Sequence, residues 1–362
     1  MKILHLVAGC GLGGIETLCK SIFEYSKEDN FLITMFSEGI NYEHMKKMGY
    51  KVFSTKNYNK KANKIVKYIY NFVIKEKINI IIIHNDRNLC NLIYISLYCK
   101  LKNKNIKFIR YFHGIYEKGQ LGITNNFIKN IITNMFIKKA IDISDELVFI
   151  SNASKRSIEK KFNIENKKSL VNYNGIPESF YKNTPERNKE LKKITICYVG
   201  RIAKVKGIDI LIKAFKRCDQ NKYHLIIVGD GEEKDNLKEL SKKLKIYNNI
   251  EFKKGTENVI QYLDESNIFV YPSIWNEGFG ISIIEAMARK CIPVTFKKGG
   301  MTEIIKNNEN GYLVDNVDDI ALSKTIKNVE FSERIYNNVY NTAKKFKINE
   351  TVKRLENSYK EI

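Results

Sequence analysis

The chain has 362 residues, of which 43% are hydrophobic, and its 62 Lys and Arg against 40 Asp and Glu give a formal net charge of +22. This length and apolar fraction allow two domains of ordinary size, each with its own core. No run of 18 or more apolar residues occurs, which excludes an obvious membrane-spanning helix. Seven scattered cysteines without a Cys-x-x-Cys pair argue against a disulfide framework and against a cysteine metal site.

The positive charge has two open explanations. It would suit nucleic acid, anionic lipid or a phosphorylated ligand. It would also arise from compositional bias, because Lys, Asn and Ile are all abundant, as in proteins from AT-rich genomes. No nucleic-acid motif accompanies the charge, so we expect no nucleic-acid partner. The apolar start before the first glycines is too short for a signal peptide, and we therefore expect a cytoplasmic, reduced protein.

The first half of the chain alternates short apolar runs with amphipathic segments. The runs predict strands over 3–7, 32–36, 80–83, 108–112, 147–150 and 170–173. Helical periodicity lies between them, for example over 62–75 and 127–140. This alternation predicts a doubly wound parallel sheet with helices on both faces, the Rossmann-like form of the α/β class.

A glycine cluster, Gly9-Cys10-Gly11-Leu12-Gly13-Gly14, follows the first predicted strand and precedes a helix. It matches the dinucleotide fingerprint G-x-G-x-x-G, and Glu38 lies near the end of the second strand, so an NAD-dependent dehydrogenase is one open interpretation. A glycine loop at a helix start also offers N–H groups to any phosphate. A turn needed only for packing is the third alternative.

The strand and helix pattern restarts after residue 193. Strands are predicted over 194–199, 225–228, 250–252, 268–271, 293–295 and 312–314. Turn signals at Asn174-Gly175-Ile176-Pro177 predict the hinge, so we divide the chain into domains at 1–173 and 174–344. A C-terminal helix over about 345–362 would pack back on the first domain or stay local. Two such domains would direct the carboxyl ends of both sheets to one cleft.

A basic loop follows the first strand of the second half. Arg201 and Lys206 lie in Gly200-Arg201-Ile202-Ala203-Lys204-Val205-Lys206-Gly207. Arg binds phosphate through two parallel hydrogen bonds, and Lys adds a mobile charge, so the pair could neutralise a diphosphate without a metal. We expect both side chains to be accessible to solvent before a ligand binds. A solvated loop without function is the alternative in so lysine-rich a chain.

Two glutamates lie eight residues apart, Glu277 before and Glu285 within a predicted helix that follows the strand over 268–271. If the residues between them are helical, both carboxylates project to one side. Carboxylates accept hydrogen bonds from hydroxyl groups, and a sugar or ribose is dense in hydroxyls. The alternative is one acid favoured by the helix dipole and one solvated glutamate.

This ordered set of motifs resembles the GT-B-fold, retaining, nucleotide-sugar glycosyltransferases of family 4, over nearly the whole chain. The motifs are Gly13-Gly14-Ile15-Glu16, His113-Gly114, Asn174-Gly175-Ile176, Val199-Gly200-Arg201 with Lys206-Gly207, Val228-Gly229-Asp230-Gly231, Pro272-Ser273 with 277–285, and Gly299-Gly300 with Glu303. The chain departs from the family pattern at Lys290, where many relatives carry a glycine.

The resemblance implies a role for each matching position. Arg201 and Lys206 would bind the donor diphosphate, and Glu285 the ribose. Glu277 and the amides of Gly278, Phe279 and Gly280 would hold the transferred sugar and the distal phosphate. His113 would approach the donor sugar, Gly13 and Gly14 would meet the phosphates, and the base would lie near Gly229 and residues 253–256. Glu16 is the candidate for acceptor binding.

The implied reaction moves a hexose from a nucleoside-diphosphate sugar, most often a UDP-sugar, to a hydroxyl of a glycan or lipid-linked glycan. The resemblance implies retention of configuration and a place in bacterial capsule, exopolysaccharide or lipopolysaccharide synthesis. No Asp-x-Asp pair occurs in a suitable loop, so we expect no metal and no other cofactor. A nucleotide-sugar epimerase of the same fold type and the dehydrogenase remain alternatives.

Two segments, 60–75 and 127–139, mix lysines with Tyr, Phe and other apolar residues at helical spacing. Basic amphipathic helices bind anionic membrane surfaces, with about 1 kcal/mol per lysine. A peripheral position at the inner face of the cell membrane is therefore one interpretation. The other is that both helices pack their apolar faces on the sheet and leave the lysines in water.

Overall fold

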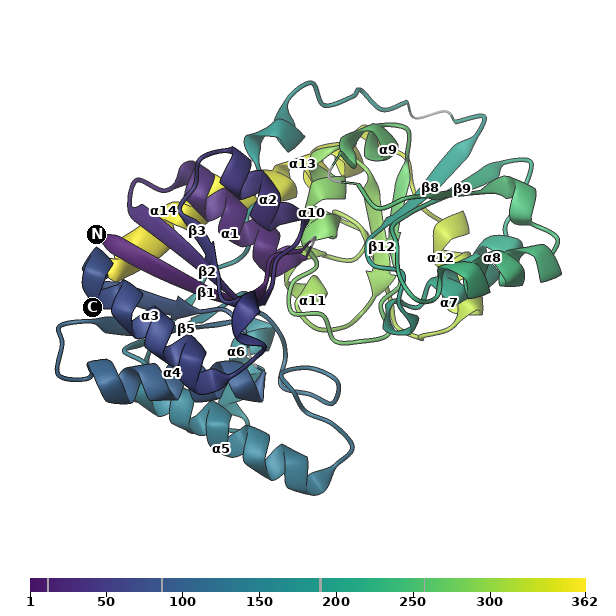
Figure 1. Cartoon of the computed structure of the whole chain (residues 1–362). Coiled ribbons are helices and arrows are strands. Elements are labelled where there is room, and N and C mark those ends of the chain that lie inside the picture. Colours follow the sequence, from purple (N-terminus) through teal and green to yellow (C-terminus); the bar gives the residue numbers. More distant parts are fainter. Residues whose placement is uncertain (12, 86, 189–190, 257) are drawn as a thin grey trace. The chain divides into compact units, whose positions relative to one another are not determined.

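The computed structural model describes residues 1–362 except 12, 86, 189, 190 and 257. The chain divides into two compact units (Figure 1). The first comprises Met1–Gly175 together with Ile348–Ile362, and the second comprises Ile176–Lys347. We refer to them as the first and second domains and describe each by itself.

The first domain is built on a seven-stranded sheet with the order β3-β2-β1-β4-β5-β6-β7, in which all paired strands run parallel. Its strands are β1 Lys2–Gly9, β2 Asp29–Ser37, β3 Val52–Ser54, β4 Ile80–Ile83, β5 Lys107–Phe112, β6 Glu146–Phe149 and β7 Lys168–Val171. The four isoleucines of β4 are all buried, as expected for a central strand covered on both faces.

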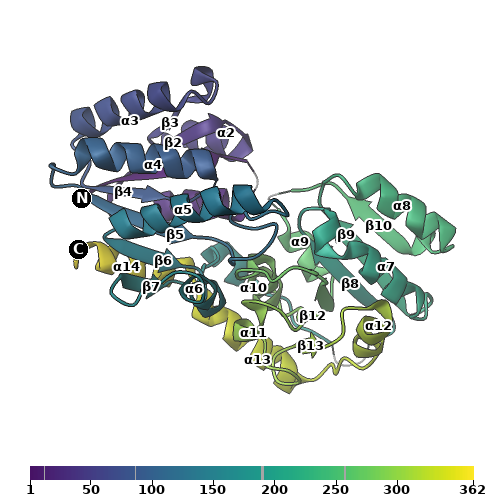
Figure 2. The ribbon, with the colours of Figure 1, turned by 90° about the horizontal axis from the view of Figure 1, so that it is seen from below.

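Helices cover both faces of this sheet. They are α1 Gly14–Tyr25, α2 Ile40–Lys47, α3 Ala62–Glu76, α4 Asn88–Leu101, α5 Phe127–Ile143, α6 Asn152–Glu159 and α14 Ile348–Tyr359, with the 3-10 turn η1 Lys56–Tyr58. Helices α3, α4 and α5 lie side by side on one face (Figure 2), whereas α1, α2 and α14 lie on the other (Figure 1). The chain therefore forms the doubly wound arrangement that alternating strands and helices predict.

The two amphipathic segments of this domain differ in what they bury. Helix α3 turns Ile65, Ile69 and Phe72 into the main core cluster, so its apolar stripe faces the sheet. Helix α5 buries Ile137 and Ile141 near its end, but its first three turns keep apolar side chains exposed. These exposed side chains are Phe127, Ile128, Ile131, Ile132 and Met135. We call this set the α5 stripe.

The last helix, α14, packs on the first domain beside α1 (Figure 1). The carboxylate of Glu356 accepts hydrogen bonds from the Ser26 hydroxyl and the Lys27 amide, both at 2.7 Å. The Thr351 hydroxyl donates to the Tyr173 carbonyl at 2.9 Å. Together with the buried Leu355, these contacts tie the end of the chain to the domain in which it begins.

The second domain contains a six-stranded parallel sheet with the order β10-β9-β8-β11-β12-β13. Its strands are β8 Ile194–Val199, β9 Tyr223–Val228, β10 Ile250–Lys253, β11 Ile268–Tyr271, β12 Ile292–Phe296 and β13 Tyr312–Val314. Strand order turns at β8, which lies between β9 and β11, and loops at the carboxyl ends of such central strands form binding sites in doubly wound sheets.

Helices also cover this second sheet. They are α7 Ile208–Lys216, α8 Lys234–Lys243, α9 Ile260–Asp264, α10 Ile281–Ala288, α11 Met301–Ile304, α12 Asp319–Lys327 and α13 Glu333–Ala343. The 3-10 turns are η2 Glu178–Tyr181, η3 Lys204–Lys206, η4 Tyr247–Asn249 and η5 Lys344–Phe346. Helix α7 packs between α8 and α12, whereas α10 packs on α13 (Figure 1).

The predicted class, two Rossmann-like α/β domains with parallel sheets, is confirmed. The sequence prediction missed one strand, β3, which is only three residues long and lies at the edge of the first sheet. The family position occupied by Lys290 adopts φ 57°, a left-handed conformation that favours glycine, so the turn after α10 is kept without the glycine. None of the described helices is long and apolar enough to cross a bilayer.

Candidate functional site

In the second domain, three candidate groups follow neighbouring strands at their carboxyl ends. The basic loop with Arg201 follows β8, Gly229 follows β9, and the segment that begins at Pro272 follows β11. Since β9, β8 and β11 are adjacent in the sheet, their loops meet at one edge. Gly207, with φ 64°, is packed so closely that a β-carbon there would lie 2.2 Å from the Pro272 carbonyl oxygen. The basic loop and the β11 loop are therefore in direct contact.

A compact polar network joins these two loops. The Lys206 ammonium donates to the Glu277 carboxylate at 2.7 Å and to the Tyr271 hydroxyl at 2.9 Å. The Ser273 hydroxyl donates to the same carboxylate oxygen at 2.5 Å. The Ile274 amide donates to the Val205 carbonyl at 3.0 Å, and this hydrogen bond joins the backbone of the β11 loop to that of the basic loop. The structure thus brings two predicted site residues, Lys206 and Glu277, into one ion pair.

The two predicted cations differ in exposure. The side chain of Lys206 is only 16% exposed and that of Glu277 only 17%, so this pair is largely withdrawn from water. Arg201 is exposed, as we expected, and its backbone carbonyl accepts a hydrogen bond from the Tyr198 hydroxyl at 2.9 Å. The expectation that both side chains are accessible is therefore wrong for Lys206. The cause is its partner Glu277, which the spacing of the sequence does not reveal.

A second glycine turn supports the Glu277 backbone. The Gly300 amide donates to the Glu277 carbonyl at 2.8 Å. A β-carbon on Gly299 would lie 2.3 Å from that carbonyl oxygen, and one on Gly300 would lie 2.1 Å from the Gly278 carbonyl oxygen. Larger residues at either position would displace the loop that carries the candidate sugar-binding group.

Helix α10 begins only at Ile281, and this overturns the spacing argument for the two glutamates. Gly280 has φ 83°, a left-handed conformation, so residues 278–280 are not helical. Glu277 therefore precedes the helix, and the loop geometry decides its direction. Phe279 buries its ring against Phe346, with ring centroids 5.5 Å apart, so the ring itself cannot contact a ligand.

Glu285 lies on α10 and is half-buried. It forms no hydrogen bond or ion pair with the described residues. Desolvation by the surrounding protein raises the pKa of its carboxyl from 4.5 to about 7. A partly buried carboxylate without a compensating charge is costly, and such groups cluster at functional sites. Hydroxyl groups of a ligand would supply the missing hydrogen bonds.

Gly229 follows β9 with φ 155°, and a β-carbon there would lie 2.0 Å from the Gly200 carbonyl oxygen. Lys234 connects this turn to the end of β10, because its ammonium donates to the carbonyls of Gly229 at 2.9 Å and Lys253 at 3.0 Å. The predicted base-binding segments, around Gly229 and at 253–256, therefore lie side by side.

In the first domain, the glycine loop caps helix α1. Gly13 is the N-cap residue, and the Glu16 carboxylate folds back so closely that a β-carbon on Gly13 would lie 2.3 Å from it. A β-carbon on the exposed Gly14 would meet no atom of the described residues within 4 Å. Burial raises the pKa of Glu16, and Arg87 opposes that rise. Leu12, within the fingerprint, lies outside the described residues.

His113 directly follows β5 and reaches the surface only in part. Its Nε2 lies 3.0 Å from Nδ1 of the buried His84, which in turn contacts His5. Burial, and secondarily the nearby Arg110 charge, lowers the pKa of His113 to about 3. His113 is therefore neutral at physiological pH, which suits hydrogen bonding to a ligand and not proton donation as an imidazolium.

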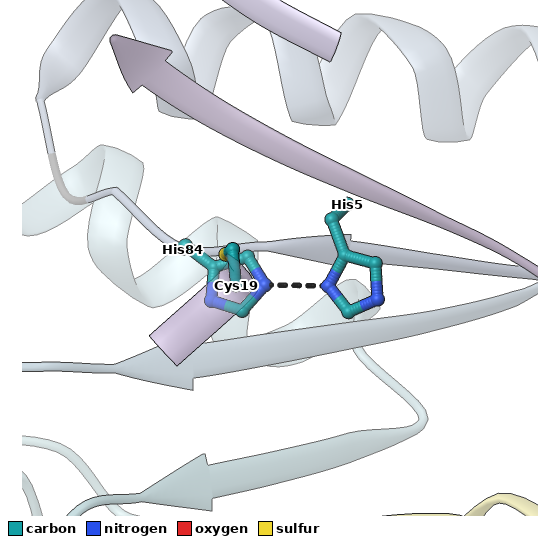
Figure 3. A group of neighbouring side chains, drawn as sticks. All are labelled: His5, Cys19 and His84. Atoms are coloured by element: carbon teal, nitrogen blue, oxygen red, sulfur yellow. Dashed lines mark hydrogen bonds between the residues drawn. The ribbon is translucent and has the colours of Figure 1, made fainter. Parts of the chain in front are cut away.

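One group among the described residues has the spacing of metal ligands. The ligand atoms of His5, Cys19 and His84 lie within 4.8 Å of one another (Figure 3). All three residues are buried, and the two imidazoles already share a hydrogen bond of 2.9 Å. No metal ligand was predicted here, and the three residues do not belong to the candidate site of the second domain.

Sequence reasoning missed several residues of these sites. Tyr271 and Ser273 complete the Lys206–Glu277 network, although Ser273 belongs to the Pro272-Ser273 motif. His5 and His84 were not singled out. The sequence shows only that each histidine lies in or directly after a predicted strand. That the two strands are neighbours, and the histidines therefore in contact, follows from the order of strands in the sheet. Glu38, the acid of the dinucleotide pattern, forms an ion pair with Lys56.

Two protein families match the chain, one in each half. The family described as Glycosyltransferase Family 4 matches residues 12–180. The family described as Glycosyl transferases group 1 matches residues 180–346. Together the two matches extend over most of the chain.

Curated relatives resemble part of the chain. An uncharacterized glycosyltransferase of Haemophilus influenzae is 31% identical over 220 residues, which cover 59% of this chain and 58% of that protein. The capsular polysaccharide biosynthesis glycosyltransferase CapM of Staphylococcus aureus is 27% identical, covering 60% of each. A third relative, from Campylobacter jejuni, is N-acetylgalactosamine-N,N'-diacetylbacillosaminyl-diphospho-undecaprenol 4-alpha-N-acetylgalactosaminyltransferase. It is 28% identical, and the match covers 61% of this chain and 60% of that protein. The matches thus span less than two thirds of these relatives.

Among solved structures, Alr3699/HepE of Anabaena in complex with UDP and glucose matches with a TM-score of 0.82. The match covers 100% of both chains at 18% sequence identity. At this identity the likeness concerns the fold, and it extends over both domains.

Proposed function

The chain belongs to the family 4 group of GT-B glycosyltransferases, and from this premise we propose that it transfers a hexose from a nucleoside-diphosphate sugar to an acceptor hydroxyl. The observation that carries the proposal is the Lys206–Glu277 pair, held by Tyr271 and Ser273 at the carboxyl edge of the second sheet. It places a cation and a hydroxyl-binding carboxylate in one loop cluster.

The proposed reaction forms a bond between the acceptor oxygen and the anomeric carbon and breaks the bond to the diphosphate. The acceptor proton passes to the departing diphosphate, and the family resemblance implies retention of configuration. Negative charge grows on the diphosphate as the bond breaks. Arg201 and Lys206 would stabilise that charge more in the transition state than in the ground state. We therefore expect no metal requirement.

The division of roles follows the surroundings of each glutamate. Glu277, fixed by Lys206 and Ser273, has its carboxylate oriented and would hold the transferred sugar. Glu285 has no partner among the described residues and would accept hydrogen bonds from the ribose hydroxyls. The ribose hydroxyls would donate the hydrogen bonds that the Glu285 carboxylate does not receive from the described residues. This gain favours binding of the nucleotide.

The acceptor is proposed from the relatives. CapM is named for capsular polysaccharide synthesis, and the Campylobacter jejuni relative acts on a diphospho-undecaprenol glycan. We propose that this chain likewise acts on a glycan or lipid-linked glycan in bacterial cell-surface polysaccharide synthesis. UDP is the proposed nucleotide, since HepE was solved with UDP.

A lipid-linked acceptor would require contact with a membrane, and the α5 stripe is the surface proposed for it. Phe127 and Ile128 are 77% and 69% exposed. The helix also carries exposed lysines, Lys129, Lys138 and Lys139. Apolar side chains beside lysines fit an anionic lipid surface. Helix α3 buries its apolar stripe, so of the two segments first considered only 127–139 supports this proposal.

A donor screen tests the proposed function. The full-length chain is incubated with UDP-, GDP- and ADP-hexoses, and release of the free nucleoside diphosphate is measured. We expect slow hydrolysis of one nucleotide class, UDP-sugars, in the absence of acceptor. A chain that consumes none of these donors, or that instead interconverts the sugar without releasing the nucleotide, would contradict transfer and favour the epimerase alternative.

A further inference from the structure

A continuous hydrogen-bond chain crosses the first sheet and ends at His113. Asn30 lies on β2, His5 on β1, His84 directly after β4 and His113 directly after β5. These strands are consecutive in the sheet order β2-β1-β4-β5. Asn30 Oδ1 lies 3.0 Å from His5 Nε2, His5 Nδ1 lies 2.9 Å from His84 Nε2 (Figure 3), and His84 Nδ1 lies 3.0 Å from His113 Nε2.

The first member of this chain has a defined orientation. The Asn30 side-chain Nδ2 donates to the Glu28 backbone carbonyl at 2.9 Å. If the amide were turned over, two oxygen acceptors would face each other. The Oδ1 atom must therefore point to His5, and an oxygen can only accept a hydrogen bond.

The orientation of Asn30 fixes the donor and acceptor roles of each histidine in turn, because a neutral imidazole carries one proton and one lone pair on its two nitrogens. His5 donates from Nε2 to Asn30, so its Nδ1 is an acceptor. His84 must then donate from Nε2 to His5, which leaves its own Nδ1 as an acceptor. By the same reasoning His113 donates from Nε2 to His84, and its Nδ1 carries the lone pair.

The structure assigns to Asn30, His5 and His84 the role of positioning residues that hold His113 in the Nε2–H tautomer, with Nδ1 as a hydrogen-bond acceptor for a ligand hydroxyl. This inference rests on the proposed function, because that function supplies the sugar. A sugar hydroxyl can donate to the bare Nδ1, whereas an ionised phosphate oxygen cannot. His113 would therefore distinguish the hydroxyl-bearing part of the donor from its diphosphate.

The protonation states support the assignment. Burial lowers the pKa of His5 to about 4, although the bond to Asn30 opposes this. Burial, together with His113, His5 and Arg110, holds the pKa of His84 well below its usual range. All three rings are then neutral at pH 7. A charged histidine would have two N–H donors, so it would face an N–H of a neighbouring histidine and one hydrogen bond of the series would be lost.

The alternative use of His5 and His84 is metal binding with Cys19. Two imidazole nitrogens bound tetrahedrally to zinc at about 2.0–2.1 Å would lie about 3.4 Å apart. Here they lie 2.9 Å apart, as in a hydrogen bond, and burial holds the pKa of the Cys19 thiol well above its usual range. The observed geometry therefore favours the hydrogen-bond chain, and the experiment below measures zinc as well.

The test is nuclear magnetic resonance of the ligand-free protein with 15N-labelled histidine. Long-range proton–nitrogen correlations distinguish protonated from bare ring nitrogens, and single His→Gln variants assign the signals. We expect His5, His84 and His113 each to carry a slowly exchanging proton on Nε2 and none on Nδ1. A proton on Nδ1 of His113, or one zinc ion per chain by elemental analysis, would overturn the assignment. No enzymatic activity is needed for this arm.

The Asn30→Leu variant tests whether Asn30 sets the direction. We expect faster exchange of the His113 Nε2 proton or a second tautomer, and a KM for the donor raised by about threefold to tenfold, the effect of one hydrogen bond. Thr55→Val is the matched control, because it removes another buried hydrogen bond of the same domain, to the Met35 carbonyl at 2.8 Å. Unchanged proton exchange in Asn30→Leu refutes the positioning role. A changed tautomer with unchanged KM refutes the ligand contact alone.

Discussion

Replacing Glu285 with Gln should stabilise the ligand-free protein above neutral pH and should weaken its binding of nucleotide. The carboxyl has a folded-state pKa of about 7, raised by burial from 4.5. Between these values the folded chain binds more protons than the unfolded chain, so stability falls as pH rises from about 4.5 to about 7. This loss of stability is complete above pH 7, where the carboxyl is ionised in both states, and absent below pH 4.5, where it is protonated in both.

The size of the effect follows from the pKa shift. At about 1.4 kcal/mol per pKa unit, the rise from 4.5 to about 7 corresponds to at most about 3.5 kcal/mol of folding free energy. Gln has nearly the same shape and no charge, so Glu285→Gln should recover up to that amount at pH 8 and almost none at pH 4.5. For a domain of this size, 3.5 kcal/mol is about 7–14 °C in Tm.

The assay uses the single tryptophan of the chain, Trp275, which lies in the second domain. Its fluorescence reports thermal unfolding of that domain and titration with UDP. We expect Glu285→Gln to bind UDP about tenfold to a hundredfold more weakly, since hydrogen bonds to charged groups contribute about 1.5–3 kcal/mol. Glu239→Gln, at an exposed position of α8, is the control for loss of one charge.

Two results would refute this reasoning. If Glu285→Gln were no more stable than wild type at pH 8, the carboxylate would not be desolvated as the structure indicates. If the variant kept full UDP affinity, Glu285 would not bind the ribose. A loss of UDP affinity in Glu277→Gln instead would exchange the roles of the two glutamates.

Three further predictions follow from the two domains. Arg201→Ala and Lys206→Ala should each lower turnover by about two to three orders of magnitude, and only Lys206→Ala should also lower the Tm, because it leaves Glu277 unpaired; near-normal kinetics in both variants would remove the diphosphate assignment. Turnover should persist after exhaustive EDTA treatment, and activity that is abolished and then restored by magnesium or manganese would contradict this. Co-sedimentation with anionic vesicles at low salt should be lost when Ile131 and Met135 become Ser, but kept when the exposed α3 residue Lys64 becomes Gln; binding that is absent in wild type, or unchanged in the α5 variant, would refute the membrane contact.

The sequence predicts the sheets well because their central strands are short, apolar and buried. β4 consists of four isoleucines, and β11 of four apolar or aromatic residues, so each stands out from its polar flanks. β3 was not predicted, because only two of its three residues, Val52 and Phe53, are apolar and no longer pattern surrounds them. The boundaries of strands also place the loops at the carboxyl ends, which is why the basic loop could be identified as a candidate site.

The contacts within the site could not be predicted from spacing. The left-handed Gly280 delays the start of α10, so an argument from helical periodicity between Glu277 and Glu285 fails. The pairing of Lys206 with Glu277 joins residues 71 positions apart, and no local pattern reports it. The histidine chain likewise depends on the spatial order of four strands, which sequence order does not give.

The most direct test of the proposed glycosyl transfer is the release of nucleoside diphosphate from a UDP-hexose, followed with and without a lipid-linked glycan acceptor, for wild type and Arg201→Ala. The proposed activity predicts that the acceptor accelerates release by the wild-type chain, that a glycosylated acceptor forms in equal amount, and that Arg201→Ala reduces both by about two to three orders of magnitude. Release that is equally fast in Arg201→Ala, or no consumption of any nucleotide sugar by the wild-type chain, would contradict it.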